Sequence, residues 1–151
     1  MSRGFTALEL LIGLAVVLLL FALATVPFSS FREAQVLNAA ASELTALLAE
    51  ARSAAVASRD SSEYGVHFEE SRTVYFKGTS FVEPSAFNKE MALDRAIEIS
   101  SIALQGGGND VVFEMLTGET NDYGAVTLRS KGNTARTKTI TVARTGVASH
   151  D

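Results

Sequence analysis

Two hydrophobic patterns divide the chain. The 24 residues from Phe5 to Phe28 are almost all apolar, and Glu9 is the one charged residue among them. An α-helix needs roughly 20 apolar residues to cross the hydrocarbon core of a bilayer, so this run is long enough to do so. We therefore predict a transmembrane helix over residues 5–28.

Behind this run the apolar residues become periodic. Residues 31–58 contain no proline or glycine, and apolar side chains recur at steps of three and four, which places them on one face of a helix. The members of this stripe are Val36, Leu37, Ala40, Ala41, Leu44, Leu47, Leu48, Ala51 and Ala55. We expect an amphipathic helix over residues 29–59, whose polar residues, Arg52 among them, face solvent or other subunits. Pro27 predicts a kink or a loosened turn between the two helical parts.

From Tyr64 onward apolar and polar residues alternate, as in half-buried strands. Strands are predicted at Tyr64–Phe68, Thr73–Lys77, Ile97–Leu104, Val111–Leu116, Ala125–Arg129 and Lys138–Ala143. Parity changes between Ile99 and Ile102, which predicts a bulge at Ser100 and Ser101. Residues 83–95 are predicted to form a loop with one helical turn near Lys89 to Leu93. The predicted fold class is α+β, with the long helix packed on an antiparallel β-sheet head over residues 60–151.

Glu9 requires an explanation. An ionised carboxylate at membrane depth costs on the order of 2.5 kcal/mol unless a partner neutralises it. A cut between Gly4 and Phe5 would create an α-amino group four residues before Glu9, on the same helical face. Two other interpretations are a secretory signal cut after Ala24 and an uncleaved membrane anchor. The acid inside the apolar run and the continuing helical pattern disfavour the signal.

The run Gly4-Phe5-Thr6-Ala7-Leu8-Glu9, followed by an apolar helix, resembles the class III leader of type IV pilins and type II secretion pseudopilins. This resemblance implies that a prepilin peptidase removes the leader, residues 1–4, after Gly4 and methylates Phe5, and that Glu9 guides assembly. It also implies a single-pass inner-membrane protein with its head in the periplasm, which joins other pilins or pseudopilins in a helical fibre for protein secretion or pilus function.

The carboxyl-terminal part carries a second resemblance. An apolar strand with Phe113, then Gly118, two further strands and Gly146-Val147 are similar to the order in GspH/FimT-type minor pseudopilins, over about the last 40 residues. The chain contains no cysteine, and so lacks the disulfide loop of many major pilins. By resemblance, this favours a minor pilin or a pseudopilin.

Composition limits the other functions. The chain has 151 residues, so about 120 remain beyond the apolar run, enough for one small domain. Its net charge of −4 gives no global attraction to nucleic acid. Five cations nevertheless occur between positions 129 and 144 with no acid among them: Arg129, Lys131, Arg136, Lys138 and Arg144.

Phosphate binding depends on such local charge. In the FimT branch, related basic residues serve DNA capture, so the resemblance suggests a DNA-binding minor pilin for DNA uptake as an alternative function. Two other interpretations stay open: a solvated hairpin, or cations that meet acidic neighbours in the fibre. Lys138 and Arg144 also share parity with the apolar residues Ile140 and Val142.

No arrangement in the sequence predicts catalysis or a cofactor. There is no cysteine nucleophile, and the triple glycine at 106–108 lacks the lysine of a phosphate loop. His67 has the opposite parity to Val66 and Phe68 and should point away from the core. Oxygen ligands for calcium occur at Asp110, Glu119, Asn121 and Asp122, but their spacing does not match a twelve-residue calcium loop, so we predict no metal.

Overall fold

A computed structural model describes residues 5–151, and it describes the side chains of all of these except 23–30. The leader with its cleavage site at Gly4 lies outside the described residues, and the side chains at the end of the segment 5–28, that of Pro27 among them, are not described. Among the helical residues with described side chains, no stretch combines the length and the apolar character needed to cross a membrane.

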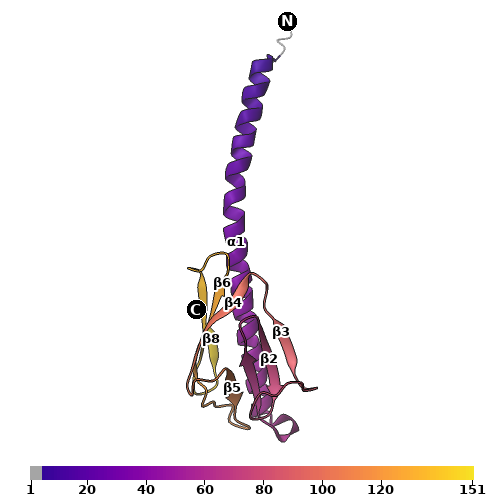
Figure 1. Ribbon diagram of the computed structural model, residues 1–151, viewed down its shortest axis with the longest axis vertical. Helices are drawn as coiled ribbons and strands as arrows, with labels where there is room; N and C mark the ends of the chain where they lie inside the picture. Colours follow the sequence, from indigo (N-terminus) through magenta and orange to yellow (C-terminus); the bar gives the residue numbers. More distant parts are fainter. Residues whose placement is uncertain (1–4) are drawn as a thin grey trace. The chain divides into compact units, whose positions relative to one another are not determined.

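One long helix and eight strands make up the described chain (Figure 1). The helix α1 spans Ala7–Val56, and a short 3-10 turn follows at Arg59–Ser61. The strands are β1 Tyr64–Phe68, β2 Arg72–Lys77, β3 Lys89–Ala92, β4 Ile97–Leu104, β5 Asp110–Phe113, β6 Gly124–Ser130, β7 Thr137–Val142 and β8 Ala148–His150. The chain divides into two compact units, one up to Ala34 and one over Gln35–Asp151.

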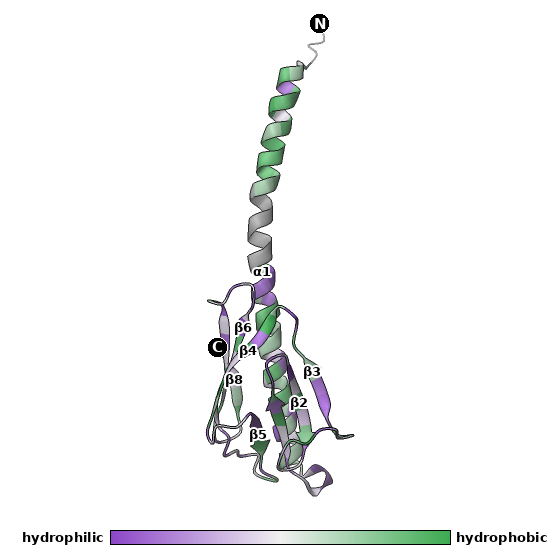
Figure 2. Ribbon diagram, in the orientation of Figure 1, coloured by the Kyte–Doolittle hydropathy of each residue, from purple (hydrophilic) through white to green (hydrophobic). Residues whose placement is uncertain are grey.

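The first unit contains an apolar part of the helix, and its large apolar side chains from Phe5 to Phe21 are exposed within the chain. Phe5 is 76% exposed, Leu14 58% and Phe21 72%. Figure 2 shows this part of α1 in hydrophobic colours over most of its described length. Burial of such surface contributes about 25 cal/mol per Å², so this helix requires an apolar environment outside its own chain.

The second unit is organised on the predicted apolar stripe of α1. Apart from Val36, which is half-buried, every predicted member is at most 6% exposed, and Leu44 and Leu48 are completely buried. The helix ends at Val56, slightly earlier than predicted, because Ser58, Asp60 and Ser61 adopt left-handed backbone conformations.

The head contains two antiparallel sheets where the sequence predicted one. The first has the strand order β3-β2-β1-β5 and the second β4-β6-β7-β8. The inner faces of both contribute to one core with the helix stripe, through residues such as Val66, Phe113, Val126 and Ile140. The fold is therefore α+β, with a long amino-terminal helix packed on an antiparallel β head, as predicted.

The bulge in β4 is confirmed, since the pairing of β4 with β6 shifts register between Ile99 and Ser101. The helical turn predicted near Lys89 is wrong. Residues 89–92 form β3, a short, largely exposed edge strand that pairs with β2 and has too few apolar residues to show alternation. The strand β8 was not predicted from the sequence. The strand β5 ends at Phe113, earlier than the predicted Leu116. Leu116 instead adopts a turn conformation with φ 71° and donates its N–H to Ala55 O.

A loop over residues 78–88 covers the outer face of the first sheet. Val74 and Phe76 lie on that face, opposite to the core residue Tyr75, yet each is 1% exposed. Phe81 of the loop packs edge-on against Phe76, with ring centroids 5.8 Å apart. Gly65 leaves room for the Phe76 ring, since a Cβ there would lie 2.6 Å from it. This sheet is therefore buried on both faces.

Arg52 was predicted to face solvent or other subunits; it is half-buried and also contacts two loops of its own chain. Its Nε donates to the carbonyl oxygens of Gly118, at 3.3 Å, and Thr145, at 3.2 Å, and so ties two loops to the end of α1. Gly146 packs directly against this contact, because a Cβ there would lie 1.9 Å from Gly118 O.

We predict that Gly146→Ala destabilises the head far more than Gly107→Ala. Both glycines have a similar φ, 77° and 74°, so the left-handed conformation costs each alanine a similar 1–2 kcal/mol or so. A Cβ at Gly107 meets nothing within 4 Å, whereas at Gly146 it overlaps backbone. Overpacking should add about 1–3 kcal/mol at Gly146. Urea unfolding of the purified protein measures the difference, and equal losses for the two variants would contradict this packing.

Candidate functional site

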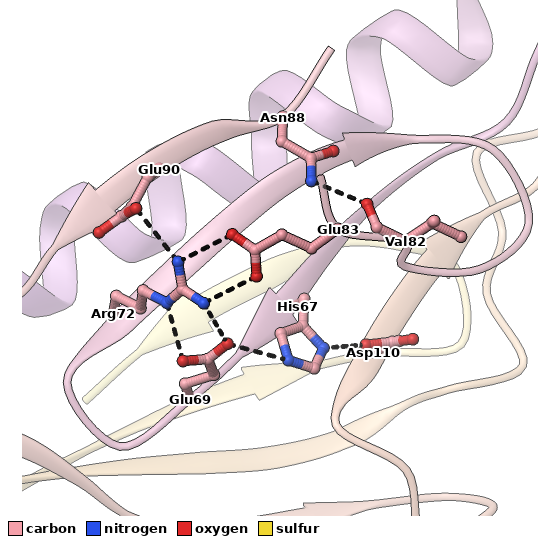
Figure 3. A network of polar contacts seen from close by, with 8 residues as sticks. All are labelled: His67, Glu69, Arg72, Val82, Glu83, Asn88, Glu90 and Asp110. Atoms are coloured by element: carbon pink, nitrogen blue, oxygen red, sulfur yellow. Dashed lines mark hydrogen bonds and ion pairs between the residues drawn. The ribbon is translucent and has the colours of Figure 1, made fainter. Parts of the chain in front are cut away.

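A network of ion pairs lies on the outer face of the first sheet, around Arg72 (Figure 3). The guanidinium contacts the carboxylate of Glu69 through Nε and Nη2, both at 2.8 Å. It also contacts Glu83 at 2.9 Å and Glu90 at 3.2 Å. The planar fork of arginine suits such multiple pairing. One side chain at the start of β2 therefore connects the β1–β2 turn, the loop 78–88 and β3.

Hydrogen bonding also shifts the pKa values in this network. The bonds from Arg72 hold the pKa of Glu69 below its usual value. The bonds to Glu69, and then those to Glu83 and Glu90, raise the pKa of Arg72. Each charged form is thus favoured by its partner.

His67 extends the network along β1. It lies on the outer face of the strand, as its parity predicted, with Nδ1 2.5 Å from Oδ1 of Asp110. Its Nε2 lies 3.6 Å from Oε1 of Glu69, and its ring stacks on Phe81 with centroids 4.1 Å apart and an interplanar angle of 7°. The loop 78–88 is therefore held by an aromatic stack as well as by the ion pair of Glu83.

The network carries a surplus of negative charge. Four carboxylates, from Glu69, Glu83, Glu90 and Asp110, surround one guanidinium, which leaves three negative charges when His67 is neutral. Within the described part of the chain, no group of three or more His, Asp and Glu side chains is arranged to hold a metal ion. The arrangement can position a loop and present an acidic surface.

One of the predicted basic residues, Arg129, lines a groove between the sheets, and a second, Lys131, contacts the groove residue Glu98. This groove has a volume of about 510 Å³ and is lined by Phe68, Ile99 and Arg129, among others. Arg129 Nε lies 2.9 Å from Oε1 of Glu98, and Lys131 Nζ lies 3.8 Å from Oε2 of the same carboxylate. Glu98 therefore offsets part of the local positive charge.

The other basic residues lie elsewhere on the second sheet. Lys138 is directly opposite Leu128 in the β6–β7 ladder, so it shares the face of that buried residue and lies on the opposite side from Arg129. Its Nζ donates to the Asp151 carbonyl. Arg136 is half-buried at the end of the β6–β7 turn, and Arg144 is exposed in the loop before β8. The structure does not gather the five cations on one surface, and DNA binding by them stays a prediction.

Three of the four residues considered as calcium ligands have side-chain partners within the protein. Asp122 Oδ2 accepts the N–H of Val112 at 3.0 Å, and Asn121 Nδ2 donates to Glu114 at 3.1 Å. Asp110 Oδ1 pairs with Nδ1 of His67.

At the other end of the chain, Thr6 begins the helix. Its Oγ1 accepts the N–H of Glu9 at 3.3 Å, and its carbonyl accepts the N–H of Leu10 at 3.2 Å. Thr6 is thus the N-cap of α1, and Glu9 is an acid in the first turn, where the helix dipole favours negative charge. The roles predicted for Gly4, Phe5 and Glu9 in processing and assembly stay predictions.

The arrangement of helix and strands matches solved structures. The type IV minor pilin FimU of Pseudomonas aeruginosa superposes with a TM-score of 0.57, over 76% of this chain and 92% of FimU, at 15% sequence identity. The protein has the pilin fold. The minor pseudopilin EpsH of the type 2 secretion system of Vibrio cholerae gives a TM-score of 0.56 over 76% of this chain and 95% of EpsH, at 11% identity. No model of a known protein family matches the sequence, and no curated protein sequence matches it significantly.

The network around Arg72 was not predicted from the sequence of this pilin-fold protein. The spacing of Glu69 and Arg72, three residues apart across a predicted turn, was the available signal. Glu83 and Glu90 lie in the segment whose pattern was weakest, and their approach to Arg72 depends on how the loop 78–88 folds back.

We predict that Arg72→Met lowers the midpoint of thermal unfolding, because three carboxylates lose their shared counter-charge. Lys89→Met is the control, since it removes one exposed ion pair, 3.3 Å from Glu50, that should contribute little. Circular dichroism measures both. An unchanged midpoint in Arg72→Met would contradict a stabilising network.

The same variant tests the pH dependence. A carboxyl whose pKa is lowered in the folded state adds stability above its usual pKa, and this stability is lost as the pH falls through the lowered value. The protein should therefore lose more stability than Arg72→Met between neutral pH and about pH 3. Equal acid losses would show that Glu69 gains nothing from Arg72.

Proposed function

We propose that this protein is a minor pilin or pseudopilin, a structural subunit of a type IV pilus or of a type II secretion pseudopilus. The observation that carries the proposal is the combination of a pilin-fold head with an apolar amino-terminal helix. The large apolar side chains from Phe5 to Phe21 are between 49% and 76% exposed within the chain. A surface of this kind is useful where it is buried by lipid and later by other helices.

The processing step follows from the first residues of the chain. Prepilin peptidase would cut after Gly4 and methylate the new terminal nitrogen of Phe5. Since α1 begins at Ala7 with Glu9 in its first turn, the carboxylate lies within about one helical turn of that nitrogen. Pairing of the two groups, within a subunit or between neighbours, would offset the cost of placing Glu9 among apolar side chains.

Storage and assembly then use the same helix. Residues 5–28 would anchor the subunit in the inner membrane as a single span, with the head in the periplasm. Extraction into a fibre would exchange lipid for the helices of neighbouring pilins. A head-to-tail contact that does not close on itself produces such a helical fibre. This function assigns no reaction to the chain.

We predict that Glu9→Gln lowers incorporation into the fibre by about tenfold, which corresponds to the loss of ~1.4 kcal/mol. Glutamine keeps the shape of the side chain and can serve in the same capping arrangement with Thr6, so the variant removes only the charge. Glu43→Gln, at an exposed position of α1, is the matched control. Quantitative immunoblots of sheared fibres against whole cells measure the ratio. Normal incorporation of Glu9→Gln would contradict the assembly role of this acid.

A further inference from the structure

Two contacts of the second sheet show which end of it lies where α1 enters the head. Thr45 Oγ1 of α1 lies 3.0 Å from Nδ1 of His150, and His150 pairs with Ile140 of β7. Farther along both elements, Arg52 Nε donates to Thr145 O at 3.2 Å. The helix and β7 therefore run in the same direction, and the start of β7 is directed toward the first turns of α1 in the head.

The β6–β7 turn, residues 131–136, lies at this end. Its last residue precedes Ile140 by four positions, which is about 13 Å of strand. Gln35, the first residue of this compact unit, precedes Thr45 by ten positions, which is about 15 Å of helix. The turn is therefore level with the point at which the chain enters the head.

Exposed cations gather around the turn. Lys131 donates its N–H to Ala96 O at 2.8 Å, so the segment that leads into β4 lies beside the turn. Arg95 of that segment and Lys131 are exposed, and Arg136 is half-buried. We refer to Arg95, Lys131 and Arg136 as the basic end of the head.

Acids offset only part of this charge. Asp94 Oδ1 accepts a backbone N–H of its own segment at 2.8 Å, and Glu98, the next acid along β4, pairs with Arg129. With Arg129 included, four cations meet two acids, which leaves two positive charges at this end of a chain whose net charge is −4. The β1–β2 turn with its acids is level with a deeper part of β4, since Glu70 O accepts the N–H of Ile99.

The proposed membrane anchor brings lipid close to the basic end. Six residues, 29–34, separate the apolar run from Gln35, and a segment of this length reaches at most about 25 Å when it is fully extended. Because the chain enters the head at the basic end, this end is the one held nearest to the headgroups. Anionic headgroups strengthen binding by about fivefold for each Lys or Arg near the surface.

We propose that the basic end rests on anionic phospholipid headgroups while the subunit is stored in the membrane. Arg95 and Lys131 pair with the headgroup phosphates, and Arg136 adds to the local positive charge. The contact orients the head on the membrane and is released when the subunit is extracted. This inference rests on the proposed function, in which residues 5–28 anchor the subunit, and deepens it by naming the surface that binds lipid.

Headgroup quenching tests this contact. A single fluorescent label can be attached to the full-length protein through Thr134→Cys, in the exposed β6–β7 turn, because the sequence contains no cysteine. Gln105→Cys, exposed just beyond the other end of β4, is the matched control position. Each protein is reconstituted into phosphatidylcholine vesicles with or without phosphatidylglycerol, and both kinds of vesicle contain the same fraction of a lipid with a nitroxide quencher on its headgroup.

Phosphatidylglycerol should increase quenching of the label at position 134 and not of the label at position 105. Raising the salt concentration from 0.1 to 1 M should abolish the increase, because the Debye length falls from about 10 to about 3 Å. In the protein labelled at position 134, Arg95→Gln should lower the equilibrium constant for the contact by about fivefold. Arg144→Gln removes an exposed arginine beyond the opposite end of β7 and should leave the constant unchanged. Circular dichroism checks that both variants are folded.

Equal quenching at position 134 with and without phosphatidylglycerol overturns the proposal, as do equal effects of Arg95→Gln and Arg144→Gln. Retention of duplex DNA by the vesicles that is lost in Arg95→Gln, without any effect of phosphatidylglycerol on the label, would assign the basic end to nucleic acid and also overturn it. Should the protein be processed at Phe5 and incorporated normally while the label shows no lipid dependence, the fibre function stands and the headgroup contact is wrong.

Discussion

Burial of one helical stripe is the interaction on which the rest of the head depends. The two sheets share no hydrogen-bonded ladder, and each contributes its inner face to the same stripe of α1, from Leu37 to Ala55. The backbone bond from Ile99 N–H to Glu70 O, at 2.9 Å, connects β4 of the second sheet to the β1–β2 turn of the first. The five buried alanines at positions 40, 41, 51, 54 and 55 allow strands to approach the helix closely. Removal of this stripe would leave two separate sheets with exposed inner faces.

The helix also links folding to the proposed role of the protein. The apolar stripe of its carboxyl-terminal part is buried in the core of the head, whereas the large apolar side chains of its amino-terminal part are exposed within the chain. A single element thus stabilises the head and carries the surface that requires a membrane or a fibre. The second layer, over the outer face of the first sheet, depends on different forces: an aromatic stack and the ion pairs of Arg72 hold a loop that presents Val82 and Phe87.

Strong periodicity made the main elements predictable. The stripe of α1, six of the eight strands and the bulge near Ser100 follow from apolar residues whose spacing is repeated several times. The exposed strand β3 and the three-residue strand β8 are too short and too polar to show such a pattern. The contacts of Arg52 were not predicted because its partners, the carbonyls of Gly118 and Thr145, are backbone atoms distant in sequence. The network around Arg72 was missed for the same reason, since tertiary folding of a loop brings Glu83 and Glu90 together.

The candidate functional residues also differ in how well the sequence predicts their arrangement. The motif from Gly4 to Glu9 is a continuous segment and can be recognised in the sequence. The basic residues between positions 129 and 144 are close in sequence, but the folded chain does not place them on one surface. Arg129 and Lys138 face opposite sides of their sheet, and Glu98 lies beside both Arg129 and Lys131. The central claim, that a pilin-type subunit is made from this chain, is tested most directly by its intact mass and amino-terminal sequence. The protein is isolated from its native host or from cells with a prepilin peptidase. The account predicts a terminus at Phe5, carrying a methyl group; a terminus at Thr25 or an uncut Met1 would contradict it.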